Sequence, residues 1–260
     1  MSTFAVFAIC AFASSFSLRL IDPLVLPIAH FFAIAPSLAV MLSPAYSVPY
    51  ALAQPFLGPL GDRFGRALCI KVCMTGMGLV LLLGSFAPSF ELLFASRVAA
   101  GVFGGGLVPL VLAALGDAYD MSNRQVMIGR MLFALIGGQM LGSVVAGLVN
   151  EVLGWRGPLG IAAALALGAA ALAWWALPSR PHAAAPGAAA AGRASFRTLY
   201  GRVFQNPKAP WLFGAVFVEG ILFFGLFPYV GEVLVGRGFA AQGVSLQVGL
   251  ILGAFGIGGL

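Results

Sequence analysis

Residues 58–66 read Gly58-Pro59-Leu60-Gly61-Asp62-Arg63-Phe64-Gly65-Arg66, between two apolar stretches that are each long enough to cross a lipid bilayer. The glycines of this segment allow the chain to turn back tightly between two helices. We expect Asp62 at the entrance to the following helix, where the positive end of the helix dipole favours an anion. The arginines are expected to stay at a water interface. The segment therefore predicts a hairpin of two membrane-spanning helices.

The composition supports this interpretation. The chain is 61% hydrophobic and only 8% charged, whereas a soluble domain carries about 25% charged residues. It contains 35 glycines in 260 residues, which suits helices that pack closely in lipid. The three cysteines (Cys10, Cys69 and Cys73) lie in apolar stretches without a CxxC pair or a histidine cluster, so no metal site or disulfide framework is expected. We predict an all-α polytopic membrane protein without a cofactor.

The apolar stretches predict seven full helices and the start of an eighth. The first stretch has no basic region or cleavage site before Arg19, so we expect it to be retained as a helix. The last stretch ends at Leu260 without a polar flank, which suggests a truncated gene product or a fragment. The predicted spans are residues 4–31, 36–59, 67–86, 89–116, 126–150, 157–177, 210–231 and 245–260.

The basic residues predict the orientation of these helices. With the N-terminus in the cytoplasm, the outer loops hold two basic residues, Arg156 and Arg237, and the inner loops and helix ends hold ten. This asymmetry explains the net charge of +6 without a nucleic-acid partner. The ten are Arg63, Arg66, Lys71, Arg124, Arg130, Arg180, Arg193, Arg197, Arg202 and Lys208.

A low-complexity segment divides the chain into three parts. Residues 178–209 are rich in alanine, proline and basic residues and cannot bury a core. We expect residues 1–177 to form a six-helix N-terminal bundle, residues 178–209 a cytoplasmic linker, and residues 210–260 the start of a second bundle. Residues 195–204 alternate apolar and basic side chains, so they form either a short amphipathic helix on the inner membrane surface or part of a solvated linker.

Four charged residues lie at least eight residues from either end of a predicted span, at a depth where a charge costs at least about 2.5–3.5 kcal/mol. Arg19 and Asp22 are three residues apart, hence on one helix face, and Pro23 follows them. Either the two neutralise each other to ease insertion, or Asp22 binds a proton or substrate while Arg19 tunes its protonation. Arg97 is deep enough to need a partner unless it snorkels outward. Glu219 is the acid near the middle of its span, and is either a proton or substrate site or a structural acid.

Several motifs together resemble those of the major facilitator superfamily. The loop matches the signature G-x-L-[GA]-D-R-x-G-R, and Arg97 with Gly101 is similar to a second signature with an arginine four residues before a glycine. The segment from Gly138 through Gly142 to Gly147 resembles a weakened antiporter signature, G-x-x-x-G-P-x-x-G-G. It departs from that signature at Ser143, which replaces the proline, and at Ala146, which replaces a glycine.

The resemblance implies a transporter that works by alternating access of two six-helix bundles, and not an enzyme. The sequence likewise lacks a phosphate loop and paired catalytic carboxylates. A cytoplasmic gate would involve Gly58, Gly61, Asp62, Arg63, Gly65 and Arg66, with Asp117 as a partner of the arginines. The coupling site or substrate cavity would involve Arg19, Asp22, Arg97 and Glu219, and Gly101, Gly138, Gly142 and Gly147 would serve helix packing.

The function that this resemblance implies is secondary transport of a small molecule, with protons as the coupling partner. The Asp22-Pro23 element and the partial signature near Gly142 favour export over uptake. The alternatives are a proton-coupled importer of a small metabolite and a truncated membrane protein that does not transport. We expect a multi-pass protein of a bacterial inner membrane, in contact with lipid and monomeric if full length, whose substrate the sequence does not identify.

Overall fold

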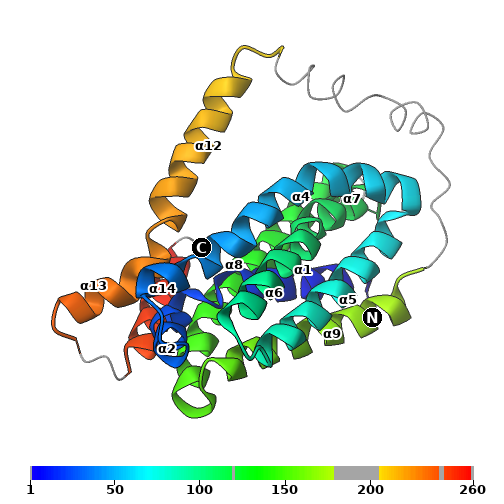
Figure 1. Ribbon diagram of the computed structural model, residues 1–260. Coiled ribbons are helices and arrows are strands. Elements are labelled where there is room, and N and C mark those ends of the chain that lie inside the picture. Colours follow the sequence, from blue (N-terminus) through cyan, green and yellow to red (C-terminus); the bar gives the residue numbers. More distant parts are fainter. Residues whose placement is uncertain (1, 119–120, 179–204, 240–242, 259–260) are drawn as a thin grey trace. The chain divides into compact units, whose positions relative to one another are not determined.

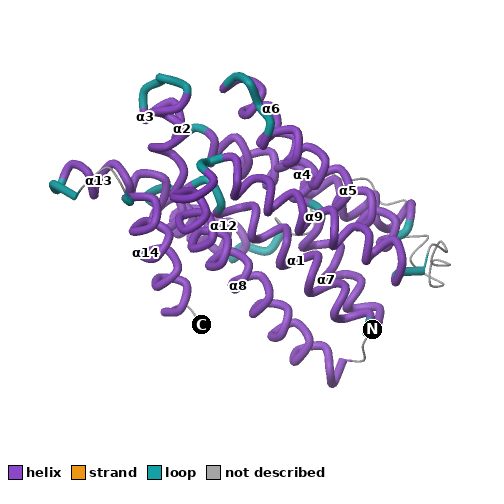
Figure 2. Tube along the Cα trace, turned by 90° about the horizontal axis from the view of Figure 1, so that it is seen from below, coloured by secondary structure: helices purple, strands orange, loops and turns teal. Residues whose placement is uncertain are grey.

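The computed structural model describes residues 2–118, 121–178, 205–239 and 243–258, and within these ranges all regular secondary structure is helical (Figure 2). The chain separates into two compact units, one formed by Met1–Arg180 with Pro228–Leu260 and the other by Pro181–Phe227. Most of the predicted linker, residues 179–204, lies outside the described residues. The division into two bundles and a cytoplasmic linker therefore stays a prediction.

The first two predicted spans are each interrupted. The first consists of α1 (Thr3–Arg19), a 3-10 turn η1 (Asp22–Leu24) and α2 (Val25–Phe31). Pro23 lies in the turn, where it lacks the N–H that would continue the α-helical hydrogen bonding. The second consists of α3 (Pro36–Val40) and α4 (Leu42–Phe64), which are separated at Met41.

The remaining helices of the first unit follow the predicted order with shifted ends. The helix predicted at 89–116 is divided at Gly106, and the one predicted at 126–150 is longer at both ends. The elements are α5 (Arg66–Ser85), α6 (Phe90–Gly105), α7 (Leu107–Ala118), α8 (Met121–Leu153), α9 (Arg156–Ala176), α13 (Val230–Gly236) and α14 (Val244–Gly258). The second unit contains α12 (Ala209–Phe224), and the 3-10 turn η2 (Phe227–Tyr229) follows it.

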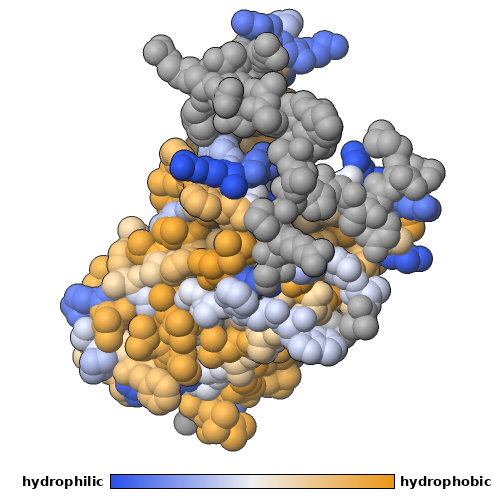
Figure 3. All heavy atoms as spheres, turned by 90° about the vertical axis from the view of Figure 1, so that its right-hand side faces the viewer, coloured by the Kyte–Doolittle hydropathy of each residue, from blue (hydrophilic) through white to orange (hydrophobic). Residues whose placement is uncertain are grey.

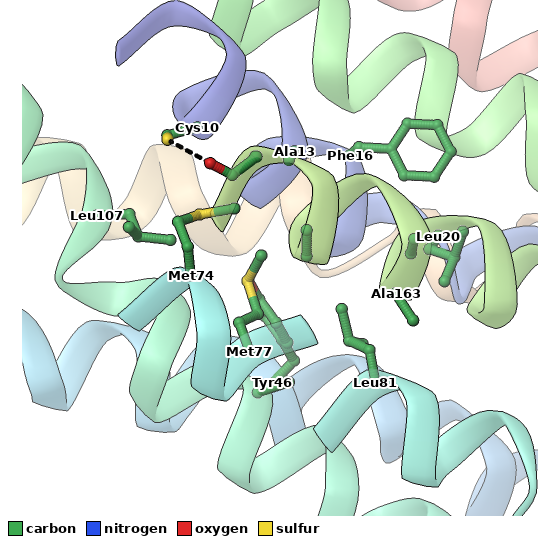
Figure 4. Close-up of a cluster of buried hydrophobic side chains, with 14 of the residues drawn as sticks. Cys10, Ala13, Phe16, Leu20, Tyr46, Met74, Met77, Leu81, Leu107 and Ala163 are labelled. Atoms are coloured by element: carbon green, nitrogen blue, oxygen red, sulfur yellow. Dashed lines mark hydrogen bonds between the residues drawn. The ribbon is translucent and has the colours of Figure 1, made fainter. Parts of the chain in front are cut away.

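Helices of the first unit run side by side (Figures 1 and 2) and enclose an apolar core. Within this unit α1 packs against α8 and α9, α5 against α6 and α9, and α14 against α8. Figure 4 shows Met74 and Met77 of α5 among the core side chains, with Tyr46 of α4 beside Met77. The same view shows the thiol of Cys10, whose Sγ is 3.9 Å from the carbonyl oxygen of Ala169.

The surface carries many apolar side chains, which cover much of the face drawn in Figure 3. Within the described residues five segments are long and apolar enough to cross a membrane. The helix α4 is not among them, because its prolines, tyrosines and Gln54 lower its mean hydropathy. The five segments are Thr3–Phe31, Arg66–Ser85, Phe90–Gly116, Asn123–Leu153 and Arg156–Ala176.

Candidate functional site

The break in the first helix holds a buried ion pair. Nη1 of Arg19 lies 3.3 Å from Oδ2 of Asp22, and the two residues are only 9% and 2% exposed. Arg19 is the last residue of α1, and Asp22 is the first residue of the 3-10 turn. Because two charges removed from water require further hydrogen bonds, the neighbours of this pair decide whether it is tolerated.

Two serines from other helices supply such bonds. The hydroxyl of Ser43, in the first turn of α4, donates to Oδ1 of Asp22 at 2.9 Å. The hydroxyl of Ser143, on α8, donates to the backbone carbonyl of Arg19 at 3.2 Å. That carbonyl is near the end of α1, where the helix no longer supplies partners for its last carbonyl groups. Sequence reasoning missed Ser43, since spacing within one helix does not identify a partner on another.

Arg97 extends this cluster toward α6. Its side chain is fully buried, its Nη1 donates to the carbonyl of Ser17 at 3.2 Å, and its guanidinium carbon lies 4.4 Å from the centroid of the Tyr46 ring. A Cβ atom at Gly101 would collide with the backbone oxygen of Tyr46, so the glycine four residues after Arg97 lets α6 approach α4. The snorkelling interpretation is therefore wrong. Arg97 is also close enough to Asp22 for their charges to interact.

The guanidinium of Arg97 is incompletely paired. Its Nε and Nη2 atoms have no hydrogen-bond partner among the residues that the structure describes. The face of the Tyr46 ring partly compensates for this, since an aromatic ring attracts a cation that approaches its face. The cluster of Arg19, Asp22, Arg97, Ser43 and Tyr46 is called the charged cluster below; it joins α1, η1, α4 and α6.

Small residues of α8 bring this helix against two neighbours. A Cβ at Gly138 or Gly142 would collide with the backbone oxygens of Phe12 and Phe16 on α1. A Cβ at Gly147 would instead meet the backbone of α14 near Ser245. The glycine spacing thus lets α8 pack against α1 and α14 at backbone distance, and it places Ser143 beside the end of α1.

The turn between α4 and α5 differs from the prediction. Helix α4 continues through Phe64, and Gly65 makes the turn with a positive φ of 93° that favours glycine. Asp62 therefore lies in the last turn of α4, and the prediction that it stands at the entrance to the next helix is wrong. Gly61 contributes by packing: a Cβ there would collide with the side chain of Leu110 on α7. Gly58 has open space where its Cβ would be.

Charged side chains connect this turn to α7. Nη2 of Arg66 lies 3.0 Å from Oδ1 of Asp62, and its Nη1 donates to the carbonyl of Ala113 at 2.6 Å. Arg63 is exposed and lies over the Phe64 ring. The side chain of Asp117, the predicted partner of the arginines, lies outside the described residues. Arg66 thus links α4, α5 and α7 at this end of the bundle.

Lys71 has an environment that the sequence did not predict. Its side chain is fully buried, and its Nζ donates to the carbonyl of Leu177 at 2.9 Å and lies 5.0 Å from the Trp174 ring centroid. Leu177 is the C-cap of α9, so the ammonium group sits at the negative end of that helix dipole. We expected Lys71 among the basic groups of the cytoplasmic surface, whereas it caps a neighbouring helix.

The break in the first helix recurs later in the chain. The order α1, η1, α2 matches α12, η2, α13: each contains a three-residue turn with proline in the middle, Pro23 or Pro228, followed by a seven-residue helix. In this register Asp22 corresponds to Phe227, and Glu219, which precedes Phe227 by eight residues, lies about 12 Å further along its helix. Glu219 is exposed on α12, so its meeting with Asp22 in one cavity stays a prediction.

The family model of the Major Facilitator Superfamily matches residues 7–260 of this chain. The chain belongs to this family of membrane transporters. The predictions of the family, of an all-α polytopic membrane fold and of a transporter in place of an enzyme are confirmed by this match and by the relatives described next.

Among curated relatives, the Multidrug efflux pump LfrA of Mycolicibacterium smegmatis is 35% identical over 111 residues, which are 42% of this chain and 22% of LfrA. The Triacylglyceride transporter of Mycobacteroides abscessus is 29% identical over 138 residues, 53% of this chain and 27% of that protein. The chain thus matches only about a quarter of the length of these two relatives.

Solved structures show the same fold. A bacterial homolog to the human lysosomal transporter Spinster, in an inward-facing and occupied conformation, has a TM-score of 0.75 at 16% identity and covers 98% of this chain and 58% of its own. A D-xylose-proton symporter has a TM-score of 0.65 at 17% identity and covers 96% of this chain and 65% of its own.

Proposed function

We propose that this chain is part of a proton-coupled transporter that exports a small molecule across a bacterial inner membrane. The observation that carries the proposal is the charged cluster, in which Asp22 is buried at the break of the first span and is paired with Arg19 and bonded to Ser43. A buried ionisable group inside a membrane bundle is by default a functional group, because its burial is costly.

The proposed mechanism uses the charge of Asp22 as a switch. When Asp22 is ionised, it attracts Arg19 and accepts a hydrogen bond from the Ser43 hydroxyl. This bond holds the break of the first span against α4. A proton on Asp22 removes that charge and weakens both contacts. Protonation therefore changes the free-energy difference between an arrangement of the break that keeps these contacts and one that lacks them. Two arrangements biased by one group are what alternating access requires.

Export is favoured over import by two features. The named function of LfrA is multidrug efflux, and the glycine spacing of α8, which resembles an antiporter signature, brings α8 against α1 and α14. Ser143 and Ala146 depart from that signature, and for this reason a proton-coupled importer remains the second candidate. Transport measurements distinguish export from import and identify the class of substrate.

Dye efflux tests the proposal. Bacteria that lack their own multidrug pumps are loaded with ethidium, a lipophilic cation, and its loss is followed with and without a protonophore. We expect production of the protein to accelerate loss, the protonophore to abolish this effect, and Asp22→Asn to abolish it as well. The matched control is Ser47→Ala, which alters an exposed serine one turn from Ser43. Dye loss that is equal in producing and non-producing cells contradicts proton-coupled export of such cations.

A further inference from the structure

Two helix breaks meet at Asp22. The first span is interrupted between Arg19 and Val25, and the second is interrupted at Met41, two residues before Ser43. The hydrogen bond from the Ser43 hydroxyl to Asp22 joins these two interruptions at 2.9 Å. Helix α2, which follows the first interruption, packs against α3, which precedes the second. The Asp22–Ser43 bond therefore links the first and second spans beside the interruption of each.

The surroundings of Asp22 define what Ser43 contributes. Arg19 approaches one carboxylate oxygen, Oδ2, and Ser43 donates to the other, Oδ1. Arg97 acts on Asp22 through its charge from α6, and on α4 the phenol of Tyr46 faces Arg97. Ser43 is thus the neutral donor to the carboxylate among the described contacts.

Helices α2, α8 and α14 also pack against η1, and the titratable residue of α2, His30, is exposed and follows Asp22 by eight residues. Helix α14 contains no titratable residue between Val244 and Gly258. On α8 the hydroxyl of Ser143 binds the Arg19 carbonyl, and the titratable residues of that helix (Arg124, Arg130 and Glu151) are at least eight residues away from Ser143.

We propose that Ser43 is a positioning residue of the coupling site, which holds the ionised Asp22 carboxylate at the junction of the two helix breaks and so sets the pH at which Asp22 takes up a proton. The step is a protonation: a proton from water adds to a carboxylate oxygen of Asp22, and the O–H bond of Ser43 stays intact. The inference rests on the proposed role of Asp22 and adds α4 as the element that responds to its charge.

The chemistry gives this proposal a direction. A hydroxyl that donates to a carboxylate stabilises the charged form relative to the protonated form. A hydrogen bond to a charged group changes an equilibrium by roughly ten- to hundredfold, which corresponds to about one to two pH units. Ser43→Ala should therefore let Asp22 keep its proton to a pH about one to two units higher, whereas Ser43→Thr keeps the hydroxyl and should restore the original midpoint.

Infrared spectroscopy measures this midpoint without a known substrate. The purified protein in lipid nanodiscs is titrated, and the carbonyl stretching band of protonated carboxylic acids is recorded. The component that disappears in Asp22→Asn belongs to Asp22. We expect Ser43→Ala to move that component to higher pH, and Ser47→Ala to leave it in place, since the Ser47 hydroxyl donates to the backbone carbonyl of Ser43.

The outcomes separate the two proposals. If Asp22→Asn removes no component at any pH, Asp22 does not exchange a proton, and both its coupling role and the inference on Ser43 are refuted. If the Asp22 component is present and its midpoint is the same in Ser43→Ala and the unaltered protein, only the inference on Ser43 is refuted. A shift that Ser43→Thr reverses supports the inference, and an equal shift in Ser47→Ala overturns it.

Discussion

The contact between α8 and α1 can be tested with two neighbouring glycines. Gly142 has the backbone oxygen of Phe16 where its Cβ would be, whereas Gly137, five residues earlier on the same helix, has nothing within 4 Å of that position. Gly142→Ala and Gly137→Ala add the same methyl group to one helix. The change in helix propensity, about 1 kcal/mol for each, therefore cancels between them.

The difference in stability between the two variants therefore reports the free-energy cost of overpacking at Gly142. The obstacle at Gly142 is backbone, which cannot rotate away as the end of a side chain can. Overpacking of this kind costs roughly 1–3 kcal/mol. With a shift of about 2–4 °C per kcal/mol for a chain of this size, Gly142→Ala should melt roughly 2–12 °C below Gly137→Ala.

Thermal unfolding in detergent micelles, followed by size-exclusion chromatography of heated samples, measures this difference. The contact also positions Ser143 on the carbonyl of Arg19, so the Asp22 band described above should be perturbed in Gly142→Ala and unchanged in Gly137→Ala. Equal melting temperatures for the two variants would refute the close packing of α8 on α1 that the glycine spacing provides.

Three further predictions concern residues 178–209, Asp62 and Lys71. Ala188→Cys in intact cells should not react with a membrane-impermeant thiol reagent, because the excess of basic residues predicts that residues 178–209 are cytoplasmic; labelling would contradict the predicted orientation. Asp62→Asn should abolish transport with a change in stability below about 1 kcal/mol, since its pair with Arg66 is exposed; transport at the normal rate contradicts a gating role. Lys71→Met should accelerate amide hydrogen exchange in the last turn of α9 about fivefold, because a capping hydrogen bond to Leu177 worth about 1 kcal/mol is lost; unchanged exchange argues against the cap.

The sequence predicted the features that depend on local solvation. A chain with 8% charged residues and apolar stretches of about twenty residues has to form helices in lipid, because every backbone polar group must be paired there. The spacing of Arg19 and Asp22 indicated an ion pair, and Pro23 indicated a distorted helix at the same place. These inferences concern residues close together in the chain, whose relative positions the helix itself sets.

The turn at residues 58–66 marks where this reasoning fails. The motif identified the hairpin, but the helix end lies at Gly65, after Asp62 and not before it. Local preference placed the acid at a helix N-terminus. The packing of Gly61 against Leu110 and the bond from Arg66 to Ala113 instead accompany a helix that continues to Phe64.

Tertiary structure alone decided the partners of the buried polar groups. Arg97 lies against Tyr46, Asp22 accepts from Ser43, and Lys71 caps α9 at Leu177, and each of these pairs joins different helices. Composition and periodicity report whether a side chain favours lipid or water, and they carry no information on how far one helix is rotated or shifted against another. That register is set by contacts such as Gly101 on Tyr46 and Gly142 on Phe16. Glycine has no side chain, so two backbones can meet there.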